Sequence, residues 1–169
     1  MSVSRSLEIL KAAIRIEKEG YEFYTENAQK VTDPTGKAMF TQLAKDELDH
    51  QRLLEMEYGS LAGTGKWRKV EKLPDRVFPS SLIFPSIQEK KKSHDKPAEL
   101  KALEIGIELE RRSEEFYSNE SERTSEVDEK VMFNHFAEIE RGHLAILEVE
   151  RDHLRNTGYW FDFREINLE

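Results

Sequence analysis

The sequence feature that most constrains the fold is a pair of Glu-x-x-His motifs. They are Glu47-Leu48-Asp49-His50 and Glu140-Arg141-Gly142-His143, and both lie in long stretches whose apolar residues recur at helical spacing. In an α-helix, residues three positions apart differ by about 60° around the axis and about 4.5 Å along it. Each motif therefore places a carboxylate and an imidazole on one helix face, where both can reach the same metal ion.

One such motif alone is weak support for a metal site. Glu occupies 26 of the 169 positions, so about one match near the five His residues is expected by chance. A third match does occur, at Glu150 and His153. Ten residues after Glu140, however, the helix has turned well away from the metal-facing direction, so we expect Glu150 to lie off the site.

An internal repeat distinguishes the first two motifs from the third. A shift of 93 residues superposes them and also places Glu17 on Glu110, Phe23-Tyr24 on Phe116-Tyr117, Met39-Phe40 on Met132-Phe133 and Leu54-Glu55 on Leu147-Glu148. The same shift places Ser60 on His153, so the third motif has no repeat partner. The repeat indicates that the chain contains two similar halves, each with one motif.

The apolar periodicity predicts an all-α fold with helices at about residues 4–31, 34–61, 97–124 and 126–156. Asp33-Pro34 is typical of an N-cap followed by proline in the first turn, so two long antiparallel helices are joined there by a short turn. We expect Gly59, Gly63 and Gly65 to end the second helix. Ser125-Glu126-Val127-Asp128 indicates a capping box at the start of the fourth.

A long connection, at about residues 62–96, separates the two predicted hairpins. It is long enough to cross over the bundle and leave the second and third helices parallel, as in ferritin-like topology. We therefore predict a single domain over residues 1–169, an up-down four-helix bundle of two repeated hairpins. The apolar stretch Val77–Pro85 and an aromatic tail at about residues 158–169 could cover the bundle or contact another subunit. They lead us to expect a homodimer.

The helical faces of the four predicted helices place four carboxylates and two imidazoles in one layer of the bundle. Its members are Glu17, Glu47, His50, Glu110, Glu140 and His143. Buried carboxylates are unfavourable without partners, and the same faces carry no Arg or Lys. Two divalent cations would balance four carboxylate charges. Oxygen-rich ligation with one nitrogen per metal suits iron or manganese, although zinc or cobalt could occupy the same ligands.

Composition excludes several other classes of function. The chain has no Cys, which rules out disulfides, thiolate catalysis and cysteine-ligated clusters within it. Its net charge of −8 argues against binding to nucleic acid. No run of apolar residues is long enough for a membrane span, and the first residues lack a signal-peptide core. We therefore expect a cytoplasmic protein that does not contact membranes.

The ligand pattern resembles the ferritin-like di-iron carboxylate proteins, in which Glu, Glu-x-x-His, Glu and Glu-x-x-His follow one another on four helices. More narrowly, AAIRIEKEGYEFY at residues 12–24 and FTQLAKDELDH at residues 40–50 resemble the rubrerythrin branch. The resemblance implies that Glu17 and Glu110 are terminal ligands, that Glu47 and Glu140 bridge two iron ions, and that His50 and His143 each bind one. It also implies reduction of hydrogen peroxide by the di-ferrous site.

Two departures from the rubrerythrin pattern bear on activity. Rubrerythrins proper carry an extra carboxylate where this chain has Ser113, and the nearest substitute is Glu114. They also carry a cysteine-ligated rubredoxin-like iron domain, which this sequence lacks, so electrons would come from a separate donor protein. Tyr24 and Tyr117, seven residues after the terminal glutamates, are expected either to pack in the core or to tune the site.

Three hypotheses follow from the sequence. The first is a rubrerythrin-like di-iron oxidoreductase that acts on hydrogen peroxide or dioxygen. The second is iron handling, in which the same site oxidises ferrous ions and passes them on. The third is a non-catalytic helical interaction module, and the presence of all six ligands argues against it.

Overall fold

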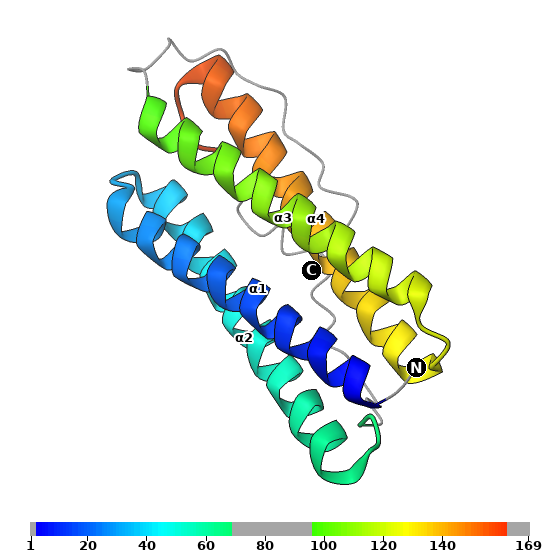
Figure 1. Ribbon diagram of the computed structural model, residues 1–169. Coiled ribbons are helices and arrows are strands. Elements are labelled where there is room, and N and C mark those ends of the chain that lie inside the picture. The colour runs from blue at the N-terminus through cyan, green and yellow to red at the C-terminus, as the bar shows by residue number, and fades with distance from the viewer. Residues whose placement is uncertain (1–2, 69–95, 162–169) are drawn as a thin grey trace, which may run out of the picture.

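A computed structural model of the protein describes residues 3–68 and 96–161, which form a bundle of long helices (Figure 1). The helices are α1 (Val3–Lys30), α2 (Pro34–Thr64), α3 (Pro97–Arg123) and α4 (Val127–Thr157). Within the described ranges there is no β-strand. The structure confirms the predicted all-α fold. The apolar stretch Val77–Pro85 and the last eight residues lie outside the described residues, so the dimer expected from them stays a prediction.

The helices form two hairpins, α1 with α2 and α3 with α4, which meet mainly through α1 and α3. Figure 1 shows α2 and α3 running in the same direction, as a crossover connection between the hairpins requires. The four helices therefore form a ferritin-like bundle.

The helix ends agree with the sequence prediction at some positions and differ at others. Asp33 caps α2 as predicted, because its carboxylate accepts hydrogen bonds from the backbone N–H groups of Thr35 and Gly36. The predicted end of α2, at about residue 61, is three residues too early. The helix continues through Gly59 and Gly63 to Thr64, and Gly65, one of the three predicted stop residues, ends it in a left-handed conformation. Glycine inside a helix weakens it without necessarily breaking it.

The predicted capping box at the start of α4 is also wrong. Glu126 is the N-cap residue and its side chain makes no capping hydrogen bond. The Thr124 hydroxyl instead accepts the Glu126 backbone N–H and donates to the buried carboxylate of Glu129. A threonine two residues before the cap thus organises the α3–α4 turn, which the Ser125 pattern did not indicate.

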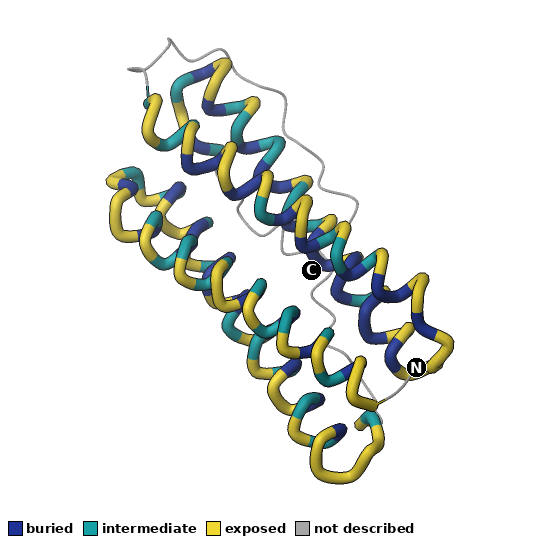
Figure 2. The backbone as a smooth tube through the Cα atoms, viewed as in Figure 1, coloured by how far each residue is buried: buried dark blue, intermediate teal, exposed yellow. Residues whose placement is uncertain are grey.

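The core consists of two apolar clusters, one toward each end of the bundle, and Figure 2 shows buried and exposed residues alternating along each helix. The Tyr24 cluster includes Tyr24, Phe40, Leu43, Leu103, Leu147, Leu154 and Trp160. The Tyr117 cluster includes Leu10, Leu54, Leu61, Tyr117, Met132, Phe133 and Phe136. Most members of one cluster are 93 residues from a member of the other. The sequence repeat is therefore a repeat of packing, and the polar layer lies between the clusters.

A tryptophan follows the second helix of each hairpin and packs on the other hairpin. The Trp160 ring meets Phe40 of α2 edge to face at a centroid distance of 5.7 Å, and its Nε1–H donates to Glu99 at 2.8 Å. Its repeat partner Trp67 meets Phe133 of α4 in the same manner at 6.5 Å. The described part of the aromatic tail therefore docks on the bundle end of its own chain, which was one of the two predicted positions.

None of the described helices is long and apolar enough to cross a membrane.

Candidate metal centre

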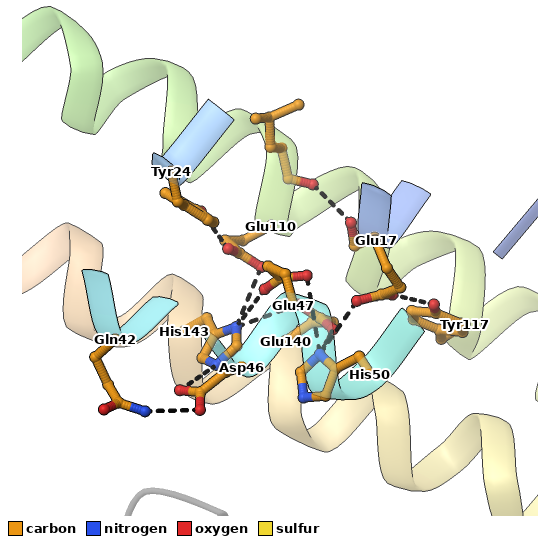
Figure 3. A network of polar contacts seen from close by, with 12 residues as sticks. Glu17, Tyr24, Gln42, Asp46, Glu47, His50, Glu110, Tyr117, Glu140 and His143 are labelled. Carbon is orange, nitrogen blue, oxygen red and sulfur yellow. Dashed lines mark hydrogen bonds and ion pairs between the residues drawn. The ribbon is translucent and has the colours of Figure 1, made fainter. Parts of the chain in front are cut away.

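The six predicted residues come together midway along the bundle, with at least one from every helix (Figure 3). Glu17 comes from α1, Glu47 and His50 from α2, Glu110 from α3, and Glu140 and His143 from α4. Each of the six is buried, and the most exposed, His50, is 7% accessible. The apolar clusters on both sides keep bulk water away from this layer, so charges within it interact strongly.

The ligand atoms fall into two groups of four. Glu17, Glu47, His50 and Glu140 offer atoms that all lie within 4.8 Å of one another, and so do Glu47, Glu110, Glu140 and His143. Glu47 and Glu140 belong to both groups. Two adjacent cations that share two carboxylates would use such an arrangement, whereas a single cation would leave part of it unused.

The two imidazoles have matching surroundings. His50 Nδ1 lies 3.1 Å from Glu17 Oε2 and 3.6 Å from Glu140 Oε1. His143 Nδ1 lies 3.6 Å from Glu110 Oε2 and 3.2 Å from Glu47 Oε1. The rings lie nearly parallel at a centroid distance of 5.6 Å. Each histidine thus faces a glutamate of its own half-site and one from the shared pair.

Several oxygens of this layer have no hydrogen-bond partner. Both carboxylate oxygens of Glu140 and Oε1 of Glu47 are buried and accept no hydrogen bond, and their nearest positive groups are imidazole nitrogens at 3.2–3.6 Å. A buried polar atom left without a partner typically costs about 1–3 kcal/mol, and more when charged. Among the described residues no Lys or Arg is buried. Cations held by these oxygens would remove both penalties, so the donor set fits a dinuclear metal site.

The electrostatics of the protein alone show the same need for positive charge. Burial and the neighbouring Glu47 raise the pKa of Glu17 to about 8. Burial, Glu47 and Glu17 also raise the pKa of Glu140 well above its ordinary value. For both imidazoles burial opposes the charge, but the surrounding carboxylates outweigh it and raise the pKa of His50 and His143. Without cations the cluster therefore retains protons, which bound metal ions would displace.

Glu47 differs from the other carboxylates. Burial disfavours its charged form, yet contacts with His143 and His50 outweigh burial and lower its pKa. Glu47 thus carries negative charge at the centre of the cluster.

Two tyrosines donate hydrogen bonds to Glu110 and Glu17 across the hairpin boundary. The Tyr24 hydroxyl of α1 donates to Glu110 of α3, and the Tyr117 hydroxyl of α3 donates to Glu17 of α1. Both tyrosines are fully buried. Tyr24 also stacks on Phe40, and Tyr117 on Phe133, which links each ligand to the tryptophan at one end of the bundle. Each tyrosine therefore packs in the core as expected, and its hydroxyl also contacts a candidate ligand, whereas tuning of the site stays a prediction.

Comparison with known proteins agrees with this geometry. A sequence model of the family described as Rubrerythrin matches residues 8–151, which include all six residues. The chain belongs to the rubrerythrin family. Among solved structures, it is similar to a hypothetical protein from Pyrococcus furiosus, with 27% sequence identity, a TM-score of 0.66 and coverage of 92% of this chain and 97% of that one. No curated protein matches the chain.

This rubrerythrin-family chain differs from the expected pattern at the extra-ligand position. Ser113 is buried, and its hydroxyl donates to the backbone carbonyl of Leu109 at 3.1 Å. Glu114 lies outside both ligand groups: its carboxylate accepts hydrogen bonds from Arg141 at 2.6 Å and from Ser118 at 3.0 Å. Glu114 therefore takes part in a surface ion pair.

One residue near the site was missed by sequence reasoning. Asp46 Oδ2 lies 3.8 Å from Nε2 of His143, on the ring edge opposite Nδ1, and its Oδ1 accepts a hydrogen bond from Gln42 at 2.8 Å. Carboxylates commonly orient metal-binding histidines in this way. The sequence feature that could have indicated Asp46 is its spacing of four residues from Gln42 on one helix. Comparison of the two repeats did not reveal it, because the residue that corresponds to Asp46 is Ile139.

The Glu150–His153 motif lies away from the centre, as predicted. Glu150 is nevertheless fully buried, and its Oε1 accepts the backbone N–H of Phe161 at 2.7 Å. Its repeat partner Glu57 is also buried and accepts the backbone N–H of Arg68 at 3.1 Å. Glu57 and Glu150 therefore hold in place the segments that carry Trp67 and Trp160.

Proposed function

We propose that this protein is a di-iron oxidoreductase that reduces hydrogen peroxide. The observation that carries the proposal is the pair of buried ligand groups that share Glu47 and Glu140, with three buried carboxylate oxygens that accept no hydrogen bond from the protein. Membership of the rubrerythrin family and the resemblance of the helical segments to that branch support the same reading.

The six candidate residues would form two overlapping ligand sets, one for each cation. Glu47 and Glu140 would contribute to both ions, Glu17 and His50 to one, and Glu110 and His143 to the other. An oxygen-rich set with one imidazole per ion favours iron or manganese over softer metals, with zinc able to occupy the same ligands. Two ferrous ions would supply the two electrons that, with two protons, convert hydrogen peroxide to two water molecules.

The protein itself supplies orientation and exclusion of water. Tyr24 and Tyr117 each hold one oxygen of a terminal carboxylate through an O–H donor, which leaves the second oxygen directed at the histidine side of the layer. Stacked rings behind the tyrosines close the site toward both ends of the bundle. Fixed donors in a dry site lose little energy to reorganisation during a reaction.

The proposal includes an external electron donor. The 169 residues contain no Cys and so no cysteine-ligated iron centre, and peroxide reduction requires two electrons for every turnover. We propose that a separate redox protein supplies them. In the absence of a donor, the reduced protein should react with peroxide once and stop.

Stopped-flow absorbance of the di-ferrous protein tests the proposed reaction. Hydrogen peroxide should oxidise the site faster than dioxygen at equal concentration, in a single turnover, with iron retained after oxidation. Faster oxidation by dioxygen followed by release of ferric iron would instead establish iron handling. Protein isolated from iron-replete cells without stoichiometric metal would contradict both.

A further inference from the structure

A small cavity opens between α1 and α3 directly over the candidate metal centre. Its volume is about 110 Å³. Glu47 and Glu110, two of the six ligand candidates, form part of its wall. The other lining residues are Ile16, Glu19, Gly20, Leu109, Arg112 and Ser113.

These six remaining residues are three repeat-related pairs. Ile16 and Leu109, Glu19 and Arg112, and Gly20 and Ser113 are each separated by 93 positions. The cavity therefore lies where the two halves of the molecule meet. Of the two ligand candidates in its wall, Glu47 belongs to both ligand groups and Glu110 only to the group of His143, so the cavity borders that half-site.

Gly20 is not required by the backbone. Among the described glycines only Gly65 and Gly158 have positive φ, so Gly20 has an ordinary helical conformation. Glycine inside a helix costs about 1 kcal/mol relative to alanine. A Cβ at Gly20 would lie 3.2 Å from Glu47 Oε2, tighter than an ordinary contact. The missing side chain thus leaves space directly above a shared carboxylate.

Ser113 presents only a small side chain to the other side of the cavity. Its hydroxyl bonds to the Leu109 carbonyl within its own helix rather than to a ligand glutamate. A serine that bonds back to its helix in this way is compact and already satisfied. The two smallest lining residues, one from each half, therefore face the same space.

We propose that this cavity is the entrance through which oxidant reaches the metal centre, that Gly20 and Ser113 keep it open, and that its small volume limits it to molecules of the size of hydrogen peroxide. The inference rests on the proposed function for the identity of the oxidant. At roughly 30 Å³ per water molecule, 110 Å³ holds about four waters. Hydrogen peroxide, with two heavy atoms, fits this space, whereas a tertiary alkyl hydroperoxide does not.

The rim offers no unpaired positive charge that would attract an anion. Glu19 and Arg112 place opposite charges at repeat-related positions, and Arg112 is already paired with Glu108 at 2.8 Å. Charged clefts accelerate encounter with ligands of the opposite sign. Hydrogen peroxide is neutral at physiological pH and needs no such steering.

The first test measures access without redox chemistry. The full-length protein is loaded with cobalt(II), and stopped-flow visible absorbance follows the binding of azide, a three-atom probe. Ser113→Leu should slow the spectral change at least tenfold with cobalt content unchanged, because the added side chain fills the cavity. Ser118→Leu is the matched control, since Ser118 lies on the same helix but not in the cavity lining, and it should behave as wild type. A wild-type azide rate in Ser113→Leu would overturn the entrance.

The second test enlarges the cavity instead of filling it. Leu109→Ala should increase the oxidation rate of the di-ferrous protein by tert-butyl hydroperoxide, relative to hydrogen peroxide, at least fivefold. An unchanged ratio would overturn the size limit. The azide measurement requires no peroxide chemistry, so it decides the entrance even if the iron protein proves not to reduce peroxide. If Ser113→Leu fails to bind cobalt, Leu109→Ala provides the remaining test of the cavity.

Discussion

At the scale of single residues, the shared carboxylates are the most sensitive positions of the centre. Each belongs to both ligand groups, so Glu47→Ala or Glu140→Ala should lower the metal content from two ions to fewer than one per chain. Elemental analysis after gel filtration measures this directly. Glu150→Gln is the matched control, because Glu150 is equally buried but lies outside both groups, and it should retain two ions. Equal metal loss in Glu47→Ala and Glu150→Gln would contradict the ligand assignment.

Glu150 should make stability depend on pH. Burial raises the pKa of its carboxyl to about 8, although the hydrogen bond from Phe161 opposes the shift. In the unfolded chain the pKa of a glutamate is about 4.3. The folded state therefore holds a proton that the unfolded state releases, so this contribution to stability is complete below about pH 4 and is lost as the pH rises to 8.

Comparison with Glu150→Gln isolates this effect, since glutamine resembles the protonated carboxyl. The free energy of unfolding of the wild type should fall relative to that of the variant by about 2–4 kcal/mol between pH 5 and pH 9. Urea unfolding curves at several pH values measure the difference. A constant difference across this range would show that Glu150 is ionised throughout.

The six site residues were predictable from the sequence because both halves of the chain carry the same pattern of Glu and His residues. Chance accounts for one Glu-x-x-His match, but not for two that share a spacing with Glu17 and Glu110. Contacts that cross between helices were not predictable in the same way. The hydrogen bonds from the tyrosines to opposite terminal glutamates, and the approach of Asp46 to His143, depend on how the two hairpins dock.

At the scale of helices, the close approach of Trp160 to α2 sets a specific requirement. A Cβ at Gly36 would overlap three atoms of the Trp160 ring. Gly36→Ala should therefore lower the free energy of unfolding by about 1–3 kcal/mol, the usual cost of forcing extra volume into a packed contact. Tryptophan fluorescence during urea unfolding reports both the stability and the displacement of the ring.

Gly59→Ala is a control that we expect to stabilise the protein, in contrast to Gly36→Ala. Gly59 lies within α2, and nothing lies within 4 Å of a Cβ placed there. Replacement by alanine should stabilise the protein by about 0.4–1 kcal/mol, because the unfolded chain loses conformational freedom and the helix loses none. If Gly36→Ala were as stable as Gly59→Ala, Trp160 would not be packed where the structure places it.

The helix spans were largely predictable from apolar periodicity, whereas two of the ends were not. Gly59 and Gly63 suggested an early stop for α2, but burial of Leu61 outweighs the weak helix propensity of glycine, and only Gly65 adopts the left-handed conformation that ends the helix. The start of α4 depends on a Thr124–Glu129 contact that no local pattern encodes.

At the scale of the whole molecule, bound metal should hold the two hairpins together. Each ligand group draws on both hairpins, so binding to the folded state stabilises the bundle by mass action. Removing the metal by dialysis against a chelator should lower the free energy of unfolding by about 2.7 kcal/mol or more, the value for a ligand present at one hundred times its dissociation constant.

Calorimetry of the metal-loaded and chelated protein measures this dependence. Glu47→Ala should show little difference between the two conditions, since it lacks a shared ligand. Equal thermal stability of loaded and chelated wild type would indicate that the hairpins associate through the apolar clusters alone.

The paired lining of the cavity also bears on how such a molecule can diverge. In a symmetric dimer of identical hairpins, position 19 would face its own copy, and two Glu or two Arg residues would oppose each other across the axis. A single chain with a duplicated hairpin escapes that constraint, so it can carry Glu19 on one side and Arg112 on the other. Duplication within one chain thus lets the mouth of the site become asymmetric while the ligands beneath it stay paired.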